Sequence, residues 1–555
     1  MATDEEIAGK VKLILIDRLA RKLHIPQKSI LPHGRYIAKI NSSLLKKLEK
    51  KQDGKLILVT SMSPTPSGEG KTTLTIGLAQ ALKLLNKKVI ACIRQPSLGP
   101  FFGVKGGATG SGYSQVLPVE DITLHFTGDD HAVVSAHNLI SSIIDNHIHH
   151  GNKLEINTNR ILWRRVSDIN DRMLRKIRVD FGGKNERTEE FHISAASEIM
   201  SILCLSQDIQ DLKRRIEKIF LAFDTNGNPI VLKDLKIQGA VTALLRNAIY
   251  PNLIQSVEGA PMFVHGGPFG NVSLGCSSLI ATKMALKLAD YVVTEAGFAT
   301  ELGAEKFFDI KCRIGGLKPS AVVIVATIKA LRVHGHSLGT YFKSVPKRGL
   351  GGLLAGGLKN LEKHIENIQR FGLPFLVAIN RFQDDTEDEL KAAITALEHK
   401  GIPAFIVDVR NKGGKGGLDT AKELMKLCKA KNNFDYLYSL KMSIKEKIAA
   451  IAKEMYGADG AVFTKEAAEN IKTLENLSYK NLPVCIAKTP KSISDNPELI
   501  GRPEGFNISV QRVMPAVGAG FLVVLCGKIL LMPGFPEHPL AERIDVDKAG
   551  NIIGL

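Results

Sequence analysis

Residues 55–85 place a strand, a glycine-rich loop and a helix in direct succession, and this order constrains the fold most strongly. The apolar run Lys55–Ser61 is typical of a buried strand. The following loop closes on Gly-Lys-Thr-Thr at residues 70–73, and apolar side chains then recur at helical spacing. Because the amides of such a loop and of a helix N-terminus attract anions, the sequence predicts a nucleotide phosphate-binding loop.

This loop predicts a site for Mg-ATP. Lys71 is expected to reach the β- and γ-phosphates, and the Thr72 hydroxyl is expected to hold Mg²⁺. The usual G-x-x-x-x-G-K-[ST] pattern has a glycine where this chain has Thr65, so an ordinary turn before a capped helix stays an alternative. The predicted ATP-binding residues are Thr65, Pro66, Ser67, Gly68, Glu69, Gly70, Lys71 and Thr72.

Strands and helices alternate along much of the chain. A second strand, Val89–Ile93, ends at Arg94, and further strands are expected at 290–294, 321–325 and 375–379. This alternation predicts an α/β fold, a P-loop-type parallel sheet with helices on both faces. Ligands of such sheets bind at the carboxyl ends of the strands, so we expect Lys71 and Arg94 to face one crevice.

The length and local patterns predict three units. Residues 1–160 and 238–445 are assigned to the nucleotide-binding domain, 161–237 to a small α/β insert, and 446–555 to a C-terminal α/β domain. Within them we expect an amphipathic helix over 4–24, a long helix over 195–219, a hairpin turn at 224–229 and a glycine loop at 349–357.

The composition limits the classes of partner expected for this chain. The chain has 74 Lys and Arg against 56 Asp and Glu, a formal net charge of +18, but the basic residues are spread out and no nucleic-acid motif appears. Its apolar stretch at 521–532 is too short for a bilayer, and no signal peptide is visible. Seven scattered cysteines without C-x-x-C indicate reduced thiols. We therefore expect a cytoplasmic protein that binds neither nucleic acid nor membrane.

Seven short phrases, in one order, carry a family resemblance. They are Thr65-Pro-Ser-Gly-Glu-Gly-Lys-Thr-Thr73, Pro96-Ser-Leu-Gly-Pro100, His265-Gly-Gly-Pro-Phe269, Glu295-Ala-Gly-Phe298 with Leu302-Gly-Ala-Glu-Lys-Phe307, Lys311-Cys-Arg313, Asn380-Arg-Phe382 and Tyr456-Gly-Ala-Asp-Gly460. From about residue 10 to its end, the chain resembles the formate–tetrahydrofolate ligases of the monofunctional type.

The resemblance implies an enzyme of one-carbon metabolism. It implies ATP-dependent ligation of formate to tetrahydrofolate through formyl phosphate, giving 10-formyltetrahydrofolate, ADP and phosphate. Lys71 and Arg94 would then be catalytic, and Phe298 and Phe382 would hold the pterin of the folate. The family also implies a homotetramer and a response to a monovalent cation such as K⁺.

Several positions depart from the family pattern. Arg410 stands where the family has a tryptophan that stacks on folate, and it is a folate-binding candidate because a guanidinium also lies flat on a π face. Gln95 replaces the usual glutamate, and residues 299–301 replace Gly-Ala-Asp. Two alternatives therefore stay open: a diverged, non-catalytic nucleotide-binding member of the family, or another P-loop ATPase that acts without folate.

Overall fold

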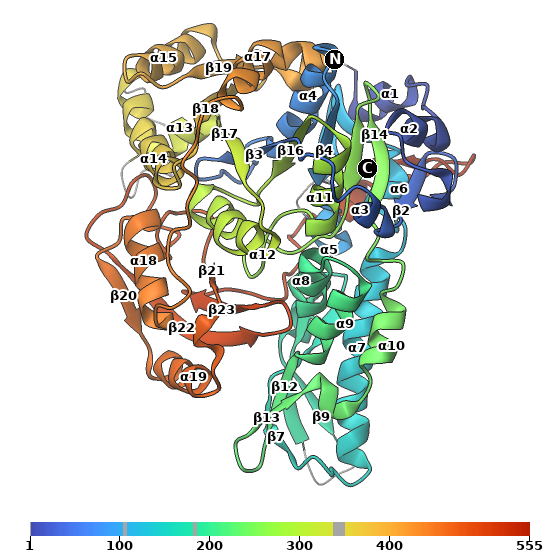
Figure 1. Cartoon of the computed structure of the whole chain (residues 1–555). Helices are drawn as coiled ribbons and strands as arrows, with labels where there is room; N and C mark the ends of the chain where they lie inside the picture. Colours follow the sequence, from blue (N-terminus) through green and yellow to red (C-terminus); the bar gives the residue numbers. More distant parts are fainter. Residues whose placement is uncertain (1, 104–107, 181–185, 337–349, 555) are drawn as a thin grey trace.

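The chain folds around a twelve-stranded, mostly parallel sheet (Figure 1). A computed structural model describes residues 2–103, 108–180, 186–336 and 350–554. Among these residues, the parallel strands lie in the order β15 (Pro261–Val264), β4 (Val89–Ile93), β16 (Tyr291–Glu295), β3 (Lys55–Ser61), β17 (Pro319–Ala326), β18 (Phe375–Asn380) and β19 (Ala404–Val407). Antiparallel strands extend the β15 side: β14 (Asn252–Ser256), β2 (Ile37–Ile40), β1 (Ile30–His33), β6 (Ser114–Leu117) and β5 (Gly110–Ser111).

Helices cover both faces of this sheet, because alternate side chains of each inner strand point to opposite sides. In β3, Leu56 and Leu58 belong to one apolar core, whereas Ile57 and Val59 belong to the other. The Ile57 face packs against α4 (Lys71–Leu84) and α17 (Leu418–Leu427), and the Leu56 face against α11 (Leu279–Leu288), α13 (Ile328–Gly335) and α14 (Leu350–Arg370). The prediction of an α/β fold with a parallel sheet between helices is confirmed.

The segment from α7 (Asp129–His149) to α10 (Gln238–Leu244) forms an arm below the main sheet in Figure 1. Its three-stranded sheet has the order β13 (Pro229–Val231), β12 (Phe220–Asp224), β7 (Ile156–Ile161), and the predicted turn at 224–229 joins β12 to β13. The arm also contains β8 (Arg165–Ser167), β9 (Ile177–Asp180), β10 (Glu186–Glu189), β11 (Phe191–Ile193), α8 (Glu198–Leu205) and α9 (Ile209–Glu217).

A second mixed sheet lies in the C-terminal part of the chain. Its strand order is β20 (Gly460–Phe463), β22 (Asn507–Ala516), β23 (Phe521–Cys526), β21 (Val484–Ala487), and α18 (Ile444–Tyr456) and α19 (Lys465–Asn476) pack beside it. The division at 160, 237 and 445 stays a proposal; β7 runs across its first boundary.

Two predicted helices are each interrupted. The expected helix over 4–24 is split into α1 (Asp4–Gly9) and α2 (Ile16–Lys22), because the backbone of Ile14 instead exchanges two hydrogen bonds, of 2.9 and 2.8 Å, with the Gln255 side chain. The expected helix over 195–219 breaks between α8 and α9, where the Asp208 carboxylate caps α9 by accepting from the amides of residues 210 and 211. In both cases, polar contacts override a continuous apolar pattern.

The predicted glycine loop at 349–357 is wrong from residue 350 onward, where α14 begins; residue 349 lies outside the described residues. Two of its glycines serve helix packing. A Cβ on Gly357 would lie 1.9 Å from the Leu331 carbonyl oxygen of α13, and one on Gly356 would lie 2.9 Å from the Gly335 carbonyl oxygen. These glycines therefore let α13 and α14 approach backbone to backbone.

We expect Gly357→Ala to destabilise the protein by about 1–3 kcal/mol or more, because the added methyl group overlaps α13. Gly239→Ala is the matched control, since Gly239 also lies in a helix but its Cβ would meet nothing within 4 Å. The control should be neutral or stabilising by up to about 1 kcal/mol. Thermal unfolding of the two variants measures the difference, and equal midpoints would contradict close packing of α13 on α14.

Candidate active site

The carboxyl ends of three adjacent parallel strands bring the predicted catalytic residues to one edge of the sheet. The order β4, β16, β3 places Arg94, Glu295 and the loop before Lys71 side by side. Such an edge is where open α/β sheets bind ligands. The strands that precede Lys71 and Arg94 flank β16, and the expectation that both side chains face one crevice stays a prediction.

The loop at 65–70 is held in shape by the buried Glu69 carboxylate. This carboxylate accepts three hydrogen bonds: from the Thr65 amide at 2.7 Å, from the Thr65 hydroxyl at 2.9 Å and from the Thr327 hydroxyl at 2.5 Å. Gly70 has a φ of +71°, and a Cβ there would lie 2.4 Å from the Asn380 side-chain nitrogen. Pro66, Ser67 and Gly68 at the tip are exposed, so the loop is pre-shaped and open to a ligand.

Lys71 is the first residue of α4, and its side chain reaches back to the end of β3. The Nζ atom donates a hydrogen bond to the Ser61 hydroxyl at 3.2 Å. Burial lowers the pKa of Lys71, whereas the Glu69 and Glu295 carboxylates oppose that shift. The lysine is thus a partly desolvated cation, which strengthens its attraction for an anion.

Glu295, the last residue of β16, joins the two halves of the site. One of its oxygens accepts from the Thr72 hydroxyl at 2.7 Å, and the other lies 3.8 Å from Arg94 Nε. Neither that second oxygen nor Arg94 Nε has a hydrogen-bond partner in the described part of the chain. Because buried polar groups are normally paired, these two atoms are candidates for hydrogen bonds to a polar ligand.

Glu295 lies in one of the family phrases, but the sequence alone did not assign it to the site. A signal was available, since Glu295 directly follows the strand expected at 290–294. The order of strands in the sheet, which sets the neighbours of each strand end, was needed to use that signal.

Of the three predicted folate-binding residues, Phe298 has a hydrogen-bonded link to Lys71. Phe298 adopts a left-handed backbone with a φ of +59°, its ring packs on Gly270, and its carbonyl accepts from the Ser61 hydroxyl at 3.0 Å. The Ser61 hydroxyl therefore hydrogen-bonds both to the Phe298 carbonyl and to the Lys71 ammonium. A bulky residue in this conformation is strained and marks a candidate functional position.

Phe382 and Arg410 follow strands farther along the sheet. Phe382 lies half-buried after β18, and its amide donates to Asp385 at 2.7 Å. Arg410, on the short helix α16 (Val409–Lys412), is exposed and lies 4.0 Å from the Asp4 carboxylate. Its backbone packs against residues 112 and 113. The contacts described for Arg410 therefore point toward the chain's N-terminal segment.

Cysteine nucleophiles and protein-held metal ions are two other chemistries that the described ranges can be checked for. All seven cysteines are buried, and burial raises the pKa of Cys92 to about 12 and that of Cys485 to about 11, so neither is a ready nucleophile. No group of three or more His, Cys, Asp or Glu side chains is arranged to hold a metal ion within residues 2–103, 108–180, 186–336 and 350–554. In the same ranges, no helix has the length and apolar character needed to cross a membrane.

The fold and these contacts define an α/β protein in which the loop at 65–70, Lys71, Arg94 and Glu295 lie at the carboxyl edge of a parallel sheet. Comparison with known proteins identifies the class more closely. The family model described as formate–tetrahydrofolate ligase matches residues 2–555. A curated formate–tetrahydrofolate ligase of Bacillus licheniformis is 51% identical over 557 residues, which span 100% of this chain and 99% of the relative. The chain therefore belongs to the formate–tetrahydrofolate ligase family, and the resemblance seen in the sequence is confirmed.

Proposed function

We propose that this protein joins formate to tetrahydrofolate in an ATP-dependent reaction that yields 10-formyltetrahydrofolate, ADP and phosphate. Membership of the ligase family supports the substrates. The observation that carries the proposal is the arrangement around Glu295, where the Thr72 hydroxyl, the Arg94 guanidinium and the desolvated Lys71 gather. The two halves of such a reaction, phosphoryl transfer and acyl transfer, need these groups in one crevice.

The first step activates formate. Its carboxylate repels nucleophiles, so a formate oxygen attacks the γ-phosphorus of ATP, the bond to the β-phosphate oxygen breaks, and formyl phosphate and ADP form. Charge spreads over the transferring phosphoryl oxygens, and catalysis of such transfers depends on positioned cations. We assign this role to Lys71 and to Mg²⁺ near Thr72.

The second step transfers the formyl group. The N10 amine of tetrahydrofolate attacks the formyl carbon, the bond from that carbon to the phosphate oxygen breaks, and N10 loses its proton as phosphate leaves. Arg94 offers a planar fork of N–H donors suited to a carboxylate or an acyl phosphate. Among the described residues, Arg94 Nε has no hydrogen-bond partner, although it lies 3.8 Å from a Glu295 oxygen, and this free donor supports placing the formyl group there.

Glu295 is proposed to act on the metal through Thr72. Its carboxylate accepts from the hydroxyl hydrogen, which turns the oxygen lone pairs of Thr72 toward the loop. Groups that orient a metal ligand in this way tune metal affinity although they do not touch the metal.

The pterin is proposed to lie beside Phe298, with Phe382 as a second aromatic contact and Arg410 as a third contact at the exposed side. Flat rings suit a flat heterocycle, and aromatic packing adds to the gain from burial. The link from Phe298 through Ser61 to Lys71 supports placing the pterin next to the formyl group.

Three further proposals rest on more general grounds. Family membership supports a homotetramer and a response to a monovalent cation such as K⁺. A cytoplasmic location is proposed because all seven cysteines are buried thiols rather than disulfides.

An oxygen-label experiment tests the proposed reaction. Purified protein receives Mg-ATP, tetrahydrofolate and formate labelled with ¹⁸O at both oxygens, and the phosphate product is analysed by mass spectrometry. Formyl phosphate chemistry leaves one formate oxygen on each phosphate, so singly labelled phosphate is expected. Unlabelled phosphate would contradict the intermediate.

The same assay separates the alternatives. Another P-loop ATPase would release ADP without formate or tetrahydrofolate, and a non-catalytic member of the family would bind nucleotide but form no product.

Lys71→Ala should lower turnover by about 10²–10³-fold or more, because a preorganised charge-stabilising donor is lost. Lys55→Ala is the control, since Lys55 lies exposed at the opposite end of β3. Steady-state formation of 10-formyltetrahydrofolate measures both variants. Near-normal turnover in Lys71→Ala would remove this lysine from the mechanism.

Arg94→Gln should cripple formation of 10-formyltetrahydrofolate while nucleotide affinity stays within a few-fold of the wild type, because the guanidinium is assigned to the formyl group. Product formation and binding of a non-hydrolysable ATP analogue, measured by calorimetry, report the two effects separately. An unchanged rate would overturn the assignment of Arg94.

Glu295→Gln should weaken the affinity for the Mg²⁺ complex of the ATP analogue by about 10–100-fold, since the amide no longer fixes the Thr72 hydroxyl as an anion does. Affinity for the analogue in excess chelator should change less. Calorimetric titrations with and without Mg²⁺ test this, and equal losses in both would assign Glu295 to the loop rather than to the metal.

A further inference from the structure

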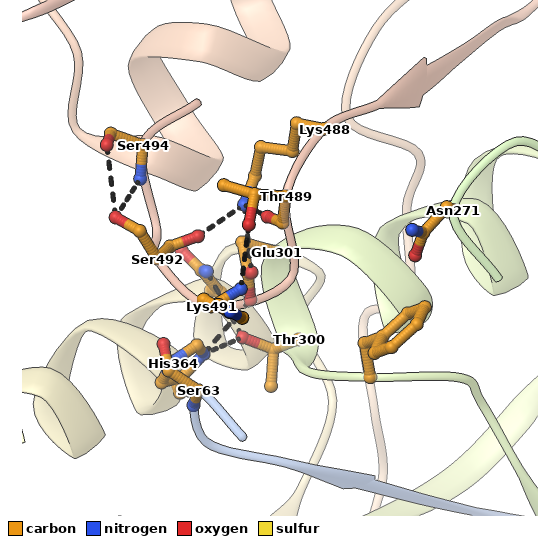
Figure 2. A network of polar contacts seen from close by, with 12 residues as sticks. Ser63, Asn271, Thr300, Glu301, His364, Lys488, Thr489, Lys491, Ser492 and Ser494 are labelled. Atoms are coloured by element: carbon orange, nitrogen blue, oxygen red, sulfur yellow. Dashed lines mark hydrogen bonds and ion pairs between the residues drawn. The ribbon is translucent and has the colours of Figure 1, made fainter. Parts of the chain in front are cut away.

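Four segments that are far apart in the sequence meet in a buried polar network (Figure 2). This network lies next to Ser63, which precedes the loop at 65–70, called the nucleotide loop below. Ser63 lies between β3 and this loop, residues 300 and 301 follow Phe298, His364 lies on α14, and Lys488–Ser494 belong to the C-terminal part. The side chains of Glu301, His364 and Lys488 are each 0% exposed. None of these residues has a role in the proposed reaction so far.

His364 bonds to two of these segments at once, and its protonation follows from its partners. The Ser63 backbone N–H can only donate, and it donates to His364 Nε2 at 2.9 Å. That nitrogen is therefore the acceptor, and Nδ1 carries the hydrogen. Nδ1 donates to the Thr300 hydroxyl oxygen at 2.7 Å and lies 3.5 Å from Glu301.

Burial keeps the His364 ring neutral, since desolvation lowers its pKa well below the usual value. The charged side chains next to the ring form an ion pair with each other: Lys488 of the C-terminal part lies 3.2 Å from Glu301. Lys488 also donates a hydrogen bond to the Ser492 carbonyl at 2.6 Å. The imidazole is thus a rigid bridge with one fixed acceptor and one fixed donor.

A second link runs parallel to this bridge. The Ser61 hydroxyl donates to the Phe298 carbonyl at 3.0 Å and accepts from Lys71 at 3.2 Å. Ser61 and Ser63 therefore each tie the root of the nucleotide loop to the segment 298–301, the first directly and the second through His364.

We propose that His364 is a positioning residue that couples the nucleotide loop to the Phe298 segment, so that nucleotide and tetrahydrofolate each tighten the binding of the other. The imidazole touches neither substrate; it holds Ser63 and Thr300 at a fixed separation. A ligand that orders one segment then orders its neighbour, and such coupling is necessarily reciprocal. The proposal rests on the proposed function, because it needs a nucleotide at the loop and a pterin at Phe298.

His334 provides a matched control. It is also a buried histidine that binds Ser63, because its Nε2 donates to the Ser63 carbonyl at 3.1 Å. Its Nδ1, however, accepts from the Gly501 amide at 3.2 Å, so this ring leads to the C-terminal part and not to Thr300. Loss of His334 removes a support of the loop but leaves the bridge to the Phe298 segment.

The experiment measures the dissociation constant of the Mg²⁺ complex of a non-hydrolysable ATP analogue with and without saturating tetrahydrofolate. Calorimetry on the full-length protein gives the ratio of the two constants for the wild type, His364→Gln, Thr300→Val and His334→Gln. We expect a wild-type ratio of about five or more, in the range usual for coupled sites. His364→Gln and Thr300→Val should bring the ratio to within about two-fold of one, whereas His334→Gln should keep the wild-type ratio even where it weakens both constants.

Thr300→Val keeps the test decisive if His364→Gln does not fold, because it removes one buried hydroxyl at nearly constant volume. Wild-type ratios in both variants, or a ratio of one in an active wild type, would overturn the coupling role and leave the proposed function intact. A wild type that binds the analogue and forms no product contradicts the proposed function, and its ratio still tests the coupling. Loss of the ratio in His334→Gln as well would show general loosening and would also overturn the proposal.

Discussion

The candidate site depends on one carboxylate, Glu295, which lies between a guanidinium and a threonine hydroxyl at the carboxyl edge of a parallel sheet. Glu295 ends the strand between β4 and β3, so its two oxygens reach toward Arg94 on one side and Thr72 on the other. The charge of Glu295 opposes the effect of desolvation on the pKa of Lys71 and offsets the repulsion between Lys71 and Arg94. Without this central acid, the repulsion between the Lys71 ammonium and the Arg94 guanidinium would not be offset.

The parts of the fold with strong local patterns could be predicted from the sequence. The strand–loop–helix unit at 55–85 and the apolar strands at 89–93 and 375–379 have the expected form, because buried parallel strands need continuous apolar runs. The hairpin turn at 224–229 was fixed by its turn residues. Lys71 and Arg94 could be assigned to one edge for the same reason, since each follows such a strand.

The remainder depends on contacts between residues far apart in the chain. Gly356 and Gly357 indicate a loop when read alone, and only the backbone of α13 shows that they serve a helix contact. Glu295 gains its role from strand order, and His364 from Ser63, which lies 301 residues earlier. Thr300 was visible in the sequence only as a departure from the family pattern. Its partner on α14 supplies a physical role.

Lys71, Thr72 and Arg94 are proposed to serve one reacting centre. A crystal structure with Mg²⁺, a non-hydrolysable ATP analogue and formate measures this most directly. We expect the terminal phosphate within hydrogen-bond distance of Lys71 Nζ, about 3 Å, and formate between that phosphate and the Arg94 guanidinium. Phosphates bound away from the loop at 65–70, or a formate out of reach of Arg94, would contradict it.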